Sequence, residues 1–255
     1  MVTSVNVKLH RISPLVLAAT AAALALSACA SSGSTAYDQR AFGFAGTQLV
    51  IEDSSSDLQG VPGSGSGITV QRWLSGTAAK PGHSSWTLSG DTLQLSIGCS
   101  GLVFSCGSRF EVAVPPGVVV VVDSGSGTDT VSGLSAPVTI NGSSGEVHVN
   151  GVSGPLQVST SSGNITAATI GSTTVHATSN QGSADISFAT APRSVTVKCS
   201  VGNATVTVPT TRHRYHVLVS SGTGNALSKV PDDRQSSSVV QVSSGNGDAT
   251  VLPAA

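Results

Sequence analysis

Ser143-Ser144-Gly145-Glu146 and Ser161-Ser162-Gly163-Asn164 are two copies of one phrase, placed 18 residues apart. Related glycines continue the series on both sides at Gly127, Gly145, Gly163, Gly182, Gly202, Gly224 and Gly247, in steps of 18, 18, 19, 20, 22 and 23 residues. Self-similarity at a period of about 20 residues is typical of proteins built from stacked structural repeats. Residues 112–255 are therefore predicted to form an array of repeats.

Each repeat is predicted to contain short β-strands. Apolar and polar residues alternate between the glycines, as in Glu146-Val147-His148-Val149 and Ser194-Val195-Thr196-Val197-Lys198-Cys199. Alternation with many β-branched residues indicates strands that have one buried face. One repeat cannot cover its own apolar side, but stacked repeats can. The pattern favours an all-β fold, a β-solenoid of the single-stranded β-helix kind, and a β-sandwich is the alternative with similar strands and turns.

The predicted interior follows from this alternation. Truncating one interior residue to alanine is expected to cost about 1–3 kcal/mol, and the outward-facing Thr196 and Lys198 should matter less. Four asparagines that each follow a glycine are expected to stack in one column: Asn164, Asn203, Asn225 and Asn246. The expected interior residues are Val147, Val158, Ile165, Ile186, Val197, Val206 and Val217.

The start of the chain has the features of an export signal. Lys8 and Arg11 precede an apolar segment, residues 12–26, that is too short to cross a bilayer comfortably. The segment ends in Leu26-Ser27-Ala28-Cys29, which resembles the lipobox of bacterial lipoproteins. The resemblance implies removal of residues 1–28 and attachment of a diacylglyceryl group to Cys29. An ordinary secretory signal with an incidental cysteine is the alternative.

The lipobox also implies a location. The protein would sit on the extracytoplasmic face of the cell membrane, anchored by lipid at Cys29. Residues 29–41, which are rich in serine and glycine at their start, are expected to be a flexible tether.

Residues 42–111 are predicted to be an N-terminal β region that caps the solenoid, since the end of a solenoid is an exposed sheet edge. Residues 48–51 and 68–71 are expected strands, and residues 86–97 an expected hairpin. Trp73 and Trp86 could form a platform on which a sugar stacks. The favoured interpretation places both rings in the core.

The order of these features resembles a known group of proteins. Val70-Gln71-Arg72-Trp73 is followed by the tryptophan hairpin, a cysteine pair, Phe110-Glu111-Val112-Ala113-Val114-Pro115 and the Ser-Gly phrases. This order is similar to the putative-adhesin, β-strand-repeat families of bacterial cell-envelope proteins, over residues 42–253. The shared motifs are structural, so the resemblance implies a fold and not an activity.

The remaining cysteines differ in their expected roles. Cys99 and Cys106 flank a six-residue loop, and disulfides persist outside the cytoplasm. A Cys99–Cys106 disulfide is expected, worth roughly 2–3 kcal/mol on the chain-entropy account. Two metal thiolates are the alternative, but they need further ligands, and no histidine is near in the sequence. Cys199 continues an inward-facing series and is expected to be a buried thiol.

Composition argues against several classes of partner. Without residues 1–28 the chain has 10 basic and 13 acidic side chains, a net charge of −3. This balance disfavours nucleic acid or anionic lipid as a ligand. The sequence contains no P-loop, dinucleotide fingerprint, zinc-protease motif or nucleophile elbow. No cofactor, metal site or catalytic residue is predicted.

A few polar residues could still carry chemistry. Residues 52–57, Glu52-Asp53-Ser54-Ser55-Ser56-Asp57, could bind Ca²⁺ weakly, but a solvated acidic turn is favoured because the EF-hand glycine and distal glutamate are missing. Asp123 and Asp129 flank a turn and are expected to make turn hydrogen bonds. His213 and His216 should point to opposite faces of a strand, so they do not converge on a metal.

Two functions remain open at this stage. The favoured one is a lipid-anchored, non-catalytic module of the cell envelope that binds, adheres or scaffolds. Its expected partners are the membrane, through the anchor, and an envelope protein or glycan. The alternative is a polysaccharide-active enzyme on a β-helix, which would need paired carboxylates.

Overall fold

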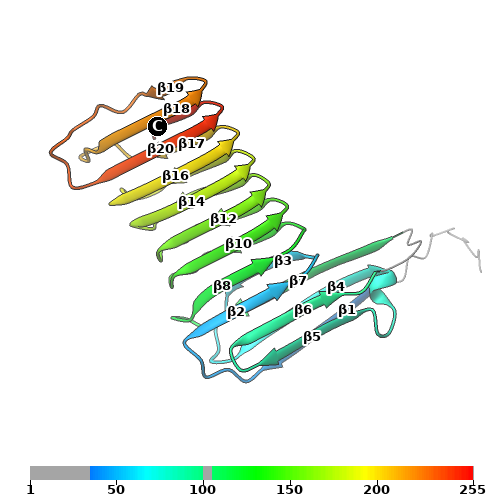
Figure 1. Cartoon of the computed structure of the whole chain (residues 1–255). Helices are drawn as coiled ribbons and strands as arrows, with labels where there is room; N and C mark the ends of the chain where they lie inside the picture. Colours follow the sequence, from blue (N-terminus) through cyan, green and yellow to red (C-terminus); the bar gives the residue numbers. More distant parts are fainter. Residues whose placement is uncertain (1–34, 100–104, 255) are drawn as a thin grey trace, which may run out of the picture. The chain divides into compact units, whose positions relative to one another are not determined.

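The computed structural model describes residues 35–99 and 105–254. Within these residues the regular structure is strand apart from one 3-10 turn, η1 (Thr77–Ala79). The strands form two sheets in which most neighbours are parallel (Figure 1). The all-β prediction is therefore confirmed. The predicted signal and Cys29 lie outside the described residues.

The larger sheet, called sheet A, has eleven strands, and the smaller, called sheet B, has ten. In spatial order sheet A contains β1 (Thr35–Phe42), β4 (Ile68–Gly76), β7 (Cys106–Val114), β3 (Asp57–Pro62), β9 (Asp129–Ser132), β11 (Val147–Asn150), β13 (Ile165–Ile170), β15 (Ala184–Phe188), β17 (Ala204–Val208), β21 (Ala249–Pro253) and β19 (Ala226–Ser228). Sheet B contains β18 (His216–Thr223), β20 (Val239–Asn246), β16 (Ser194–Val201), β14 (Thr174–Gln181), β12 (Leu156–Ser162), β10 (Val138–Ser144), β8 (Val119–Ser124), β2 (Gln48–Asp53), β6 (Thr92–Ile97) and β5 (Ser84–Ser89).

Each repeat, called a coil from here on, gives one strand to sheet B and the next strand to sheet A. For example, β12 pairs in parallel with β10 and β14, and β13 pairs in parallel with β11 and β15. Side chains at equivalent positions therefore stack from one coil to the next, and the core lies between the sheets. Thr196 and Lys198 face outward, as predicted. All seven predicted interior residues are buried: Val147, Val158, Ile165, Ile186, Val197, Val206 and Val217.

The recurring glycines mark the corner at which the chain passes from sheet B to sheet A. Gly145 has φ +123° and Gly163 has φ +147°, a region that favours glycine. A Cβ on Gly163 would lie 2.8 Å from the carbonyl carbon of Gly145 and closer still to its oxygen. The glycine phrase therefore recurs because successive corners touch through their backbones.

The coil order at the C-terminal end differs from the sequence order. The last coil, β20 and β21, lies between β16/β17 and β18/β19, as Figure 1 shows for β20. Residues 209–215 lead from β17 to β18 and leave one position in the stack empty. Residues 229–238 then lead from β19 back to β20, which fills that position. Tyr215 fixes the first of these segments, because its fully buried side chain donates a hydrogen bond from Oη to Pro209 O at 2.7 Å. The two longest glycine steps accompany this exchange, but they did not by themselves predict it.

The predicted asparagine column holds for three of its four members. Asn246 is the exception: it stands before Gly247, within β20, where it pairs with Val201 and Thr223. The residue of that coil that enters the column is the aspartate after the glycine. From coil to coil, the column consists of Asn164, Ser183, Asn203, Asp248 and Asn225, linked by hydrogen bonds of 2.8–3.1 Å.

The N-terminal region continues the same two sheets. β2 pairs in parallel with β8 and β6, and β3 pairs in parallel with β9 and β7. Three antiparallel strands complete this end: β4 on β7, β1 on β4, and β5 on β6. The predicted hairpin of residues 86–97 is confirmed as β5 and β6, with Trp86, Leu93 and Leu95 buried.

Of two predictions about the N-terminal end, the disulfide is confirmed and the flexible tether is wrong in part. Cys99 and Cys106 are joined by a disulfide, as predicted. Residues 35–41, expected in the flexible tether, instead lie in β1, which pairs with β4 along its whole length. The correction has a physical cause: β4 offers a free sheet edge, and Tyr37 packs its ring against Trp73 at a centroid distance of 5.4 Å.

Candidate functional site

Two carboxylates are buried at the corner where β2 leads to β3 and β8 leads to β9. Asp53 is 2% exposed and accepts hydrogen bonds from the backbone N–H and the hydroxyl of Ser56. Asp129 is also 2% exposed and accepts a hydrogen bond from the Ser124 hydroxyl. The expectation of a turn hydrogen bond for Asp129 is confirmed. The expectation of a solvated acidic turn is wrong for Asp53, because its turn packs against the Gly125–Gly127 corner of the next coil.

Burial controls the electrostatics of this corner. Desolvation raises the pKa of Asp129 from 3.8 to about 6, with further contributions from the charges of Asp53 and Asp57. Burial also raises the pKa of Asp53. Oδ1 of Asp129 has no hydrogen-bond partner among the described residues. Both side chains are almost completely buried, so a substrate cannot reach them as the structure stands, and the corner acts as a structural element.

Asp129→Asn should make the folded protein less sensitive to pH. The raised pKa means that the folded state favours the neutral acid. Asp129 therefore stabilises the folded state fully below pH 3.8, and this contribution to the free energy of unfolding is lost as pH rises through about 6. For a shift of this size the loss is on the order of 3 kcal/mol. Urea unfolding at pH 4 and pH 7 should show a drop in the free energy of unfolding for wild type and a smaller drop for Asp129→Asn.

The matched control is Asp123→Asn. Asp123 is exposed and accepts a hydrogen bond from Asn141 Nδ2 at 2.8 Å, which crosses between strands rather than closing its own turn as predicted. Its substitution should leave the pH dependence of stability as in wild type. An Asp129→Asn variant with the wild-type drop would contradict the assignment of this pH dependence to Asp129.

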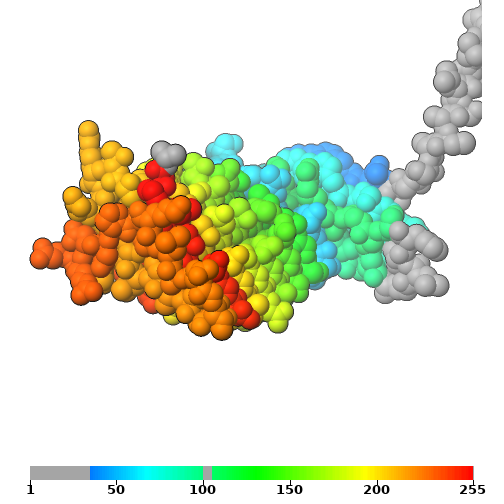
Figure 2. Space-filling view, turned by 90° about the horizontal axis from the view of Figure 1, so that it is seen from above, coloured from blue at the N-terminus to red at the C-terminus, as the bar shows by residue number. Residues whose placement is uncertain are grey.

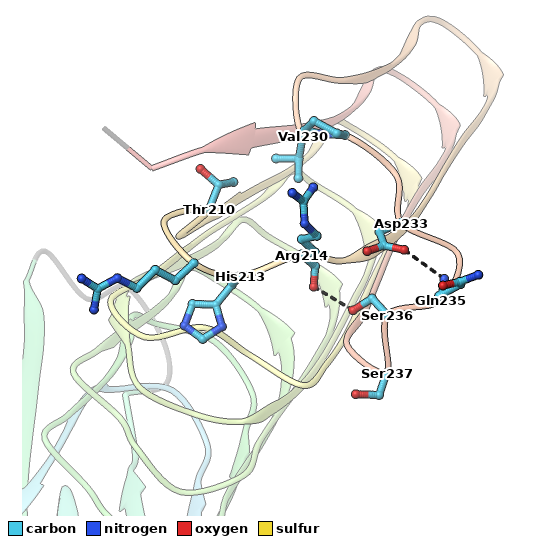
Figure 3. Close-up of a pocket in the computed structure, with 10 residues that line it drawn as sticks. Thr210, His213, Arg214, Val230, Asp233, Gln235, Ser236 and Ser237 are labelled. Atoms are coloured by element: carbon cyan, nitrogen blue, oxygen red, sulfur yellow. Dashed lines mark hydrogen bonds between the residues drawn. The ribbon is translucent and has the colours of Figure 1, made fainter.

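His213 and His216 were expected on opposite faces of one strand, which is wrong, because β18 begins at His216 and His213 lies in the segment before it. His216 Nδ1 lies 2.9 Å from Asp232 Oδ1, and this hydrogen bond is the largest of the contacts that lower the pKa of Asp232. His213 lines a separate surface pocket of about 750 Å³ between residues 209–215 and 229–238 (Figure 3). The polar groups of this pocket form hydrogen bonds with the loops themselves. Ser236 donates to Arg214 O at 2.7 Å, which joins the two loops, and Asp233 accepts from Gln235 N within one loop.

The thiol of Cys199 lies in the interior, as predicted. Cys199 is free and 3% exposed, and burial raises the pKa of its thiol, which disfavours the nucleophilic thiolate. Among residues 35–99 and 105–254, no three His, Cys, Asp or Glu side chains come together in a way that could hold a metal ion.

The outward face of sheet A brings an aromatic and charged row together. Tyr37 on β1 pairs with Trp73 on β4, Trp73 with Arg109 on β7, and Arg109 with Asp57 on β3. The guanidinium of Arg109 lies over the Trp73 ring at 4.0 Å. Asp57 accepts a hydrogen bond from Thr128 N at 3.0 Å through Oδ1. One residue from each of four neighbouring strands thus lies on one line across the sheet.

A second row lies beside it, two residues away on each strand, toward the N-terminus on the antiparallel β4 and toward the C-terminus on the others: Gln39, Gln71, Glu111 and Gln59. Tyr37 Oη links the two rows, since it lies 3.0 Å from Gln71 Oε1 and 3.1 Å from Gln39 Oε1. Gln71 Nε2 in turn donates to Glu111 Oε1 at 3.4 Å. The two rows together are called the sheet-A groove.

Two adjoining hollows make this face concave. One, of about 580 Å³, is lined by Tyr37, Trp73 and Arg109 among others, and one of about 310 Å³ is lined by Gln59 and Thr130 among others. Asp57 and Arg109 line both hollows, so the two lie side by side. The strands of this end, coloured from blue to green, lie at the opposite end from the orange and red C-terminal coils in Figure 2.

The two tryptophans therefore have different roles. Trp86 is 8% exposed, and the Arg72 guanidinium lies over its ring at 4.0 Å, so its predicted core position is confirmed. Trp73 was expected in the core as well, but it is only half-buried and faces outward. The alternation Val70, Arg72, Leu74 on the inner face of β4 was the signal that could have placed Trp73 outside.

Comparison with known proteins identifies the repeats. Residues 119–252, just over half of the chain, match the family described as Toastrack DUF4097. The chain belongs to the Toastrack family. The resemblance to adhesin-like β-repeat proteins drawn from the sequence is thereby confirmed at the level of the family. The sheet-A groove lies on β1, β4, β7 and β3, outside the part that matches Toastrack.

One solved structure, a protein from Bacteroides fragilis, supports the fold of this Toastrack chain. A "putative adhesin" from Bacteroides fragilis is 14% identical with a TM-score of 0.55, over 87% of this chain and 99% of that one. A "putative adhesin" and a "putative lipid binding protein" from Parabacteroides distasonis are 12% and 10% identical, with TM-scores of 0.42 and 0.39. They cover 87% and 88% of this chain, and each matches over 98% of its own length. No curated protein matches the sequence.

Proposed function

We propose that the protein is a lipid-anchored module of the bacterial cell envelope that binds a partner without catalysing a reaction. The observation that carries the proposal is the sheet-A groove, in which eight side chains from four strands form one continuous polar and aromatic surface. Such a surface suits extended contact with a partner. Catalysis by paired acids, by contrast, would need accessible carboxylates, and the close pair at the Asp53 and Asp129 corner is buried.

The repeats supply a rigid support for this surface. We infer that the coils from β8 to β21 form a β-solenoid, because consecutive coils pair in parallel in both sheets around one core. In a solenoid each coil contacts only its neighbours, so a stack of coils is a rigid rod. The sheet-A groove lies at one end of this rod, at a fixed distance from the C-terminal coils. The name of the similar Bacteroides fragilis structure, a "putative adhesin", agrees with a binding role.

The anchor would place the groove next to the membrane. Thr35, the first described residue, lies six positions after Cys29, and it opens β1, the strand that carries Tyr37. In the part of the chain that the structure describes, no helix has the length and hydropathy of a membrane span. We propose attachment through a lipid on Cys29, with the domain on the extracytoplasmic side and an envelope protein or glycan as the bound partner.

Cys29→Ser should release the protein from the membrane and abolish its contact with the partner. A photo-crosslinking amino acid at Gln39, on the rim of the groove, should capture an envelope component in intact cells when the anchor is present. Membrane fractionation, labelling with radioactive palmitate and mass spectrometry of the crosslinks measure the two effects. The same amino acid at Thr166, exposed on the outward face of β13, should give no specific product.

The outcomes separate the two parts of the proposal. Cys199→Ser is the control for loss of a cysteine, and it should keep the label and the membrane location. A Cys29→Ser protein that stays with the membrane would refute the anchor. Equal crosslinking from positions 39 and 166 would refute the groove as the binding surface.

A further inference from the structure

The sheet-A groove places one exposed aromatic ring beside a ladder of hydrogen-bonding groups. Tyr37 is 56% exposed, and the other large exposed apolar residues of the described chain, Val201, Leu218 and Leu227, are aliphatic. We propose that this groove binds an uncharged oligosaccharide, with one sugar ring packed against Tyr37. The proposal rests on the binding function proposed above and adds the chemical class of the ligand.

The aromatic part of the groove suits the apolar face of a sugar. Arg109 covers one side of the Trp73 ring, so Tyr37 offers the more open surface, and the tilted Trp73 ring packs beside it. A tyrosine combines an apolar ring with a polar tip, which favours sites that are apolar at one end and wet at the other. A pyranose has the same division, because its C–H groups line one face and its hydroxyls lie around the edge.

The polar part supplies both donors and acceptors. The backbone of Arg109 belongs to the sheet, but its guanidinium makes no side-chain hydrogen bond among the described residues, so these donors can turn to a ligand. Asp57 uses Oδ1 for Thr128 N, which leaves Oδ2 as an acceptor, and Gln59 can donate and accept. Sugar hydroxyls also donate and accept, and neighbouring hydroxyls can pair with a carboxylate and a guanidinium at the same time.

Charge and polarity exclude other ligand classes. Arg109 is the only basic residue in the two rows, and Asp57 and Glu111 outweigh it, so the groove does not favour a polyanion. An acyl chain would have to cover these charges without giving them hydrogen bonds, which is costly. An uncharged ligand rich in hydroxyls meets both conditions.

The dimensions favour a chain of sugars over a single sugar. The row from Tyr37 to Asp57 crosses three gaps between strands, a length of about 14 Å. Gly107 helps to keep the floor open, since a Cβ there would approach Ser75 Oγ to 2.5 Å. The groove lies along the sheet surface, so a longer glycan can pass through it.

The test measures binding of uncharged hexasaccharides to the full, processed protein in detergent. Cellohexaose, chitohexaose and mannohexaose, titrated by calorimetry, serve as the probes. At least one should bind saturably, and Tyr37→Ala should weaken that binding on the order of tenfold or more. Leu227→Ala is the matched control, because it also removes an exposed apolar side chain from the outward face of sheet A, at the other end of the sheet. It should bind like wild type.

Each other result overturns the proposal in a defined way. Absence of saturable binding by all three sugars refutes the saccharide as ligand, and a peptide or protein captured at Gln39 would then leave the binding function intact. Equal weakening by Tyr37→Ala and Leu227→Ala would refute the site. The midpoint of thermal unfolding is measured for both variants as well. A midpoint equal to that of wild type shows that weaker binding does not result from unfolding of the protein.

Discussion

Gly163→Ala is expected to destabilise the protein by about 4 kcal/mol or more, in the range reserved for severe single substitutions. The new Cβ would meet the Gly145 carbonyl, which is backbone and cannot move aside as a side chain can. Gly163 also has φ +147°, where residues other than glycine are strained. In a domain of this size the midpoint of thermal unfolding should fall by roughly 10 °C or more. Calorimetry or circular dichroism would measure it.

The control for this substitution is Gly43→Ala. A Cβ on Gly43 has no atom within 4 Å, and its φ is not positive. A change within about 0.5 kcal/mol is expected there. Similar midpoints for the two variants would mean that the corners of successive coils do not touch, and the account of the repeating glycines would then be wrong.

The individual coils could be predicted from the sequence because their signals are local. Alternation identifies which side chains enter the core, as for Val147 and Val206, and the glycine phrase marks the corner at which coils touch. Both signals depend on residues only a few positions apart. For the same reason the loop between Cys99 and Cys106 could be assigned its disulfide.

The order of the coils could not be predicted, because every coil presents nearly the same surface to its neighbours. β18/β19 and β20/β21 have the same alternation and the same corner glycine, so either pair could dock on β16/β17. The difference lies in the positions facing inward. Ser228 in β19 aligns with Val251 in β21, and Ser228 is exposed, which suits a polar residue at the end of the stack. That contrast was the available signal.

The candidate site shows a related limit. The sheet-A groove combines β1, β4, β7 and β3, which are far apart in sequence and come together only through mixed parallel and antiparallel pairing. Tyr37 was assigned to a tether, so no pattern connected it with Trp73. The turn that contains Asp53 was expected to be solvated because it lacks the features of a calcium loop. The corner that buries Asp53 belongs to the following coil, and nothing near Asp53 in the sequence signals it.

Ile186→Ala is expected to lower the free energy of unfolding by about 2–5 kcal/mol, more than the roughly 1–3 kcal/mol expected of an interior position in general, because isoleucine loses more buried atoms than the valines at most of these positions. Ile186 is fully buried, and it stacks between Ala167 and Val206 of the adjacent coils, so truncation leaves a cavity that small neighbours cannot fill. Lys198→Ala is the control, because that side chain lies on the outward face and should cost less than about 0.5 kcal/mol. Urea unfolding measures both values. Equal losses would mean that one continuous core does not hold the coils together, and the stacked arrangement would have to be abandoned.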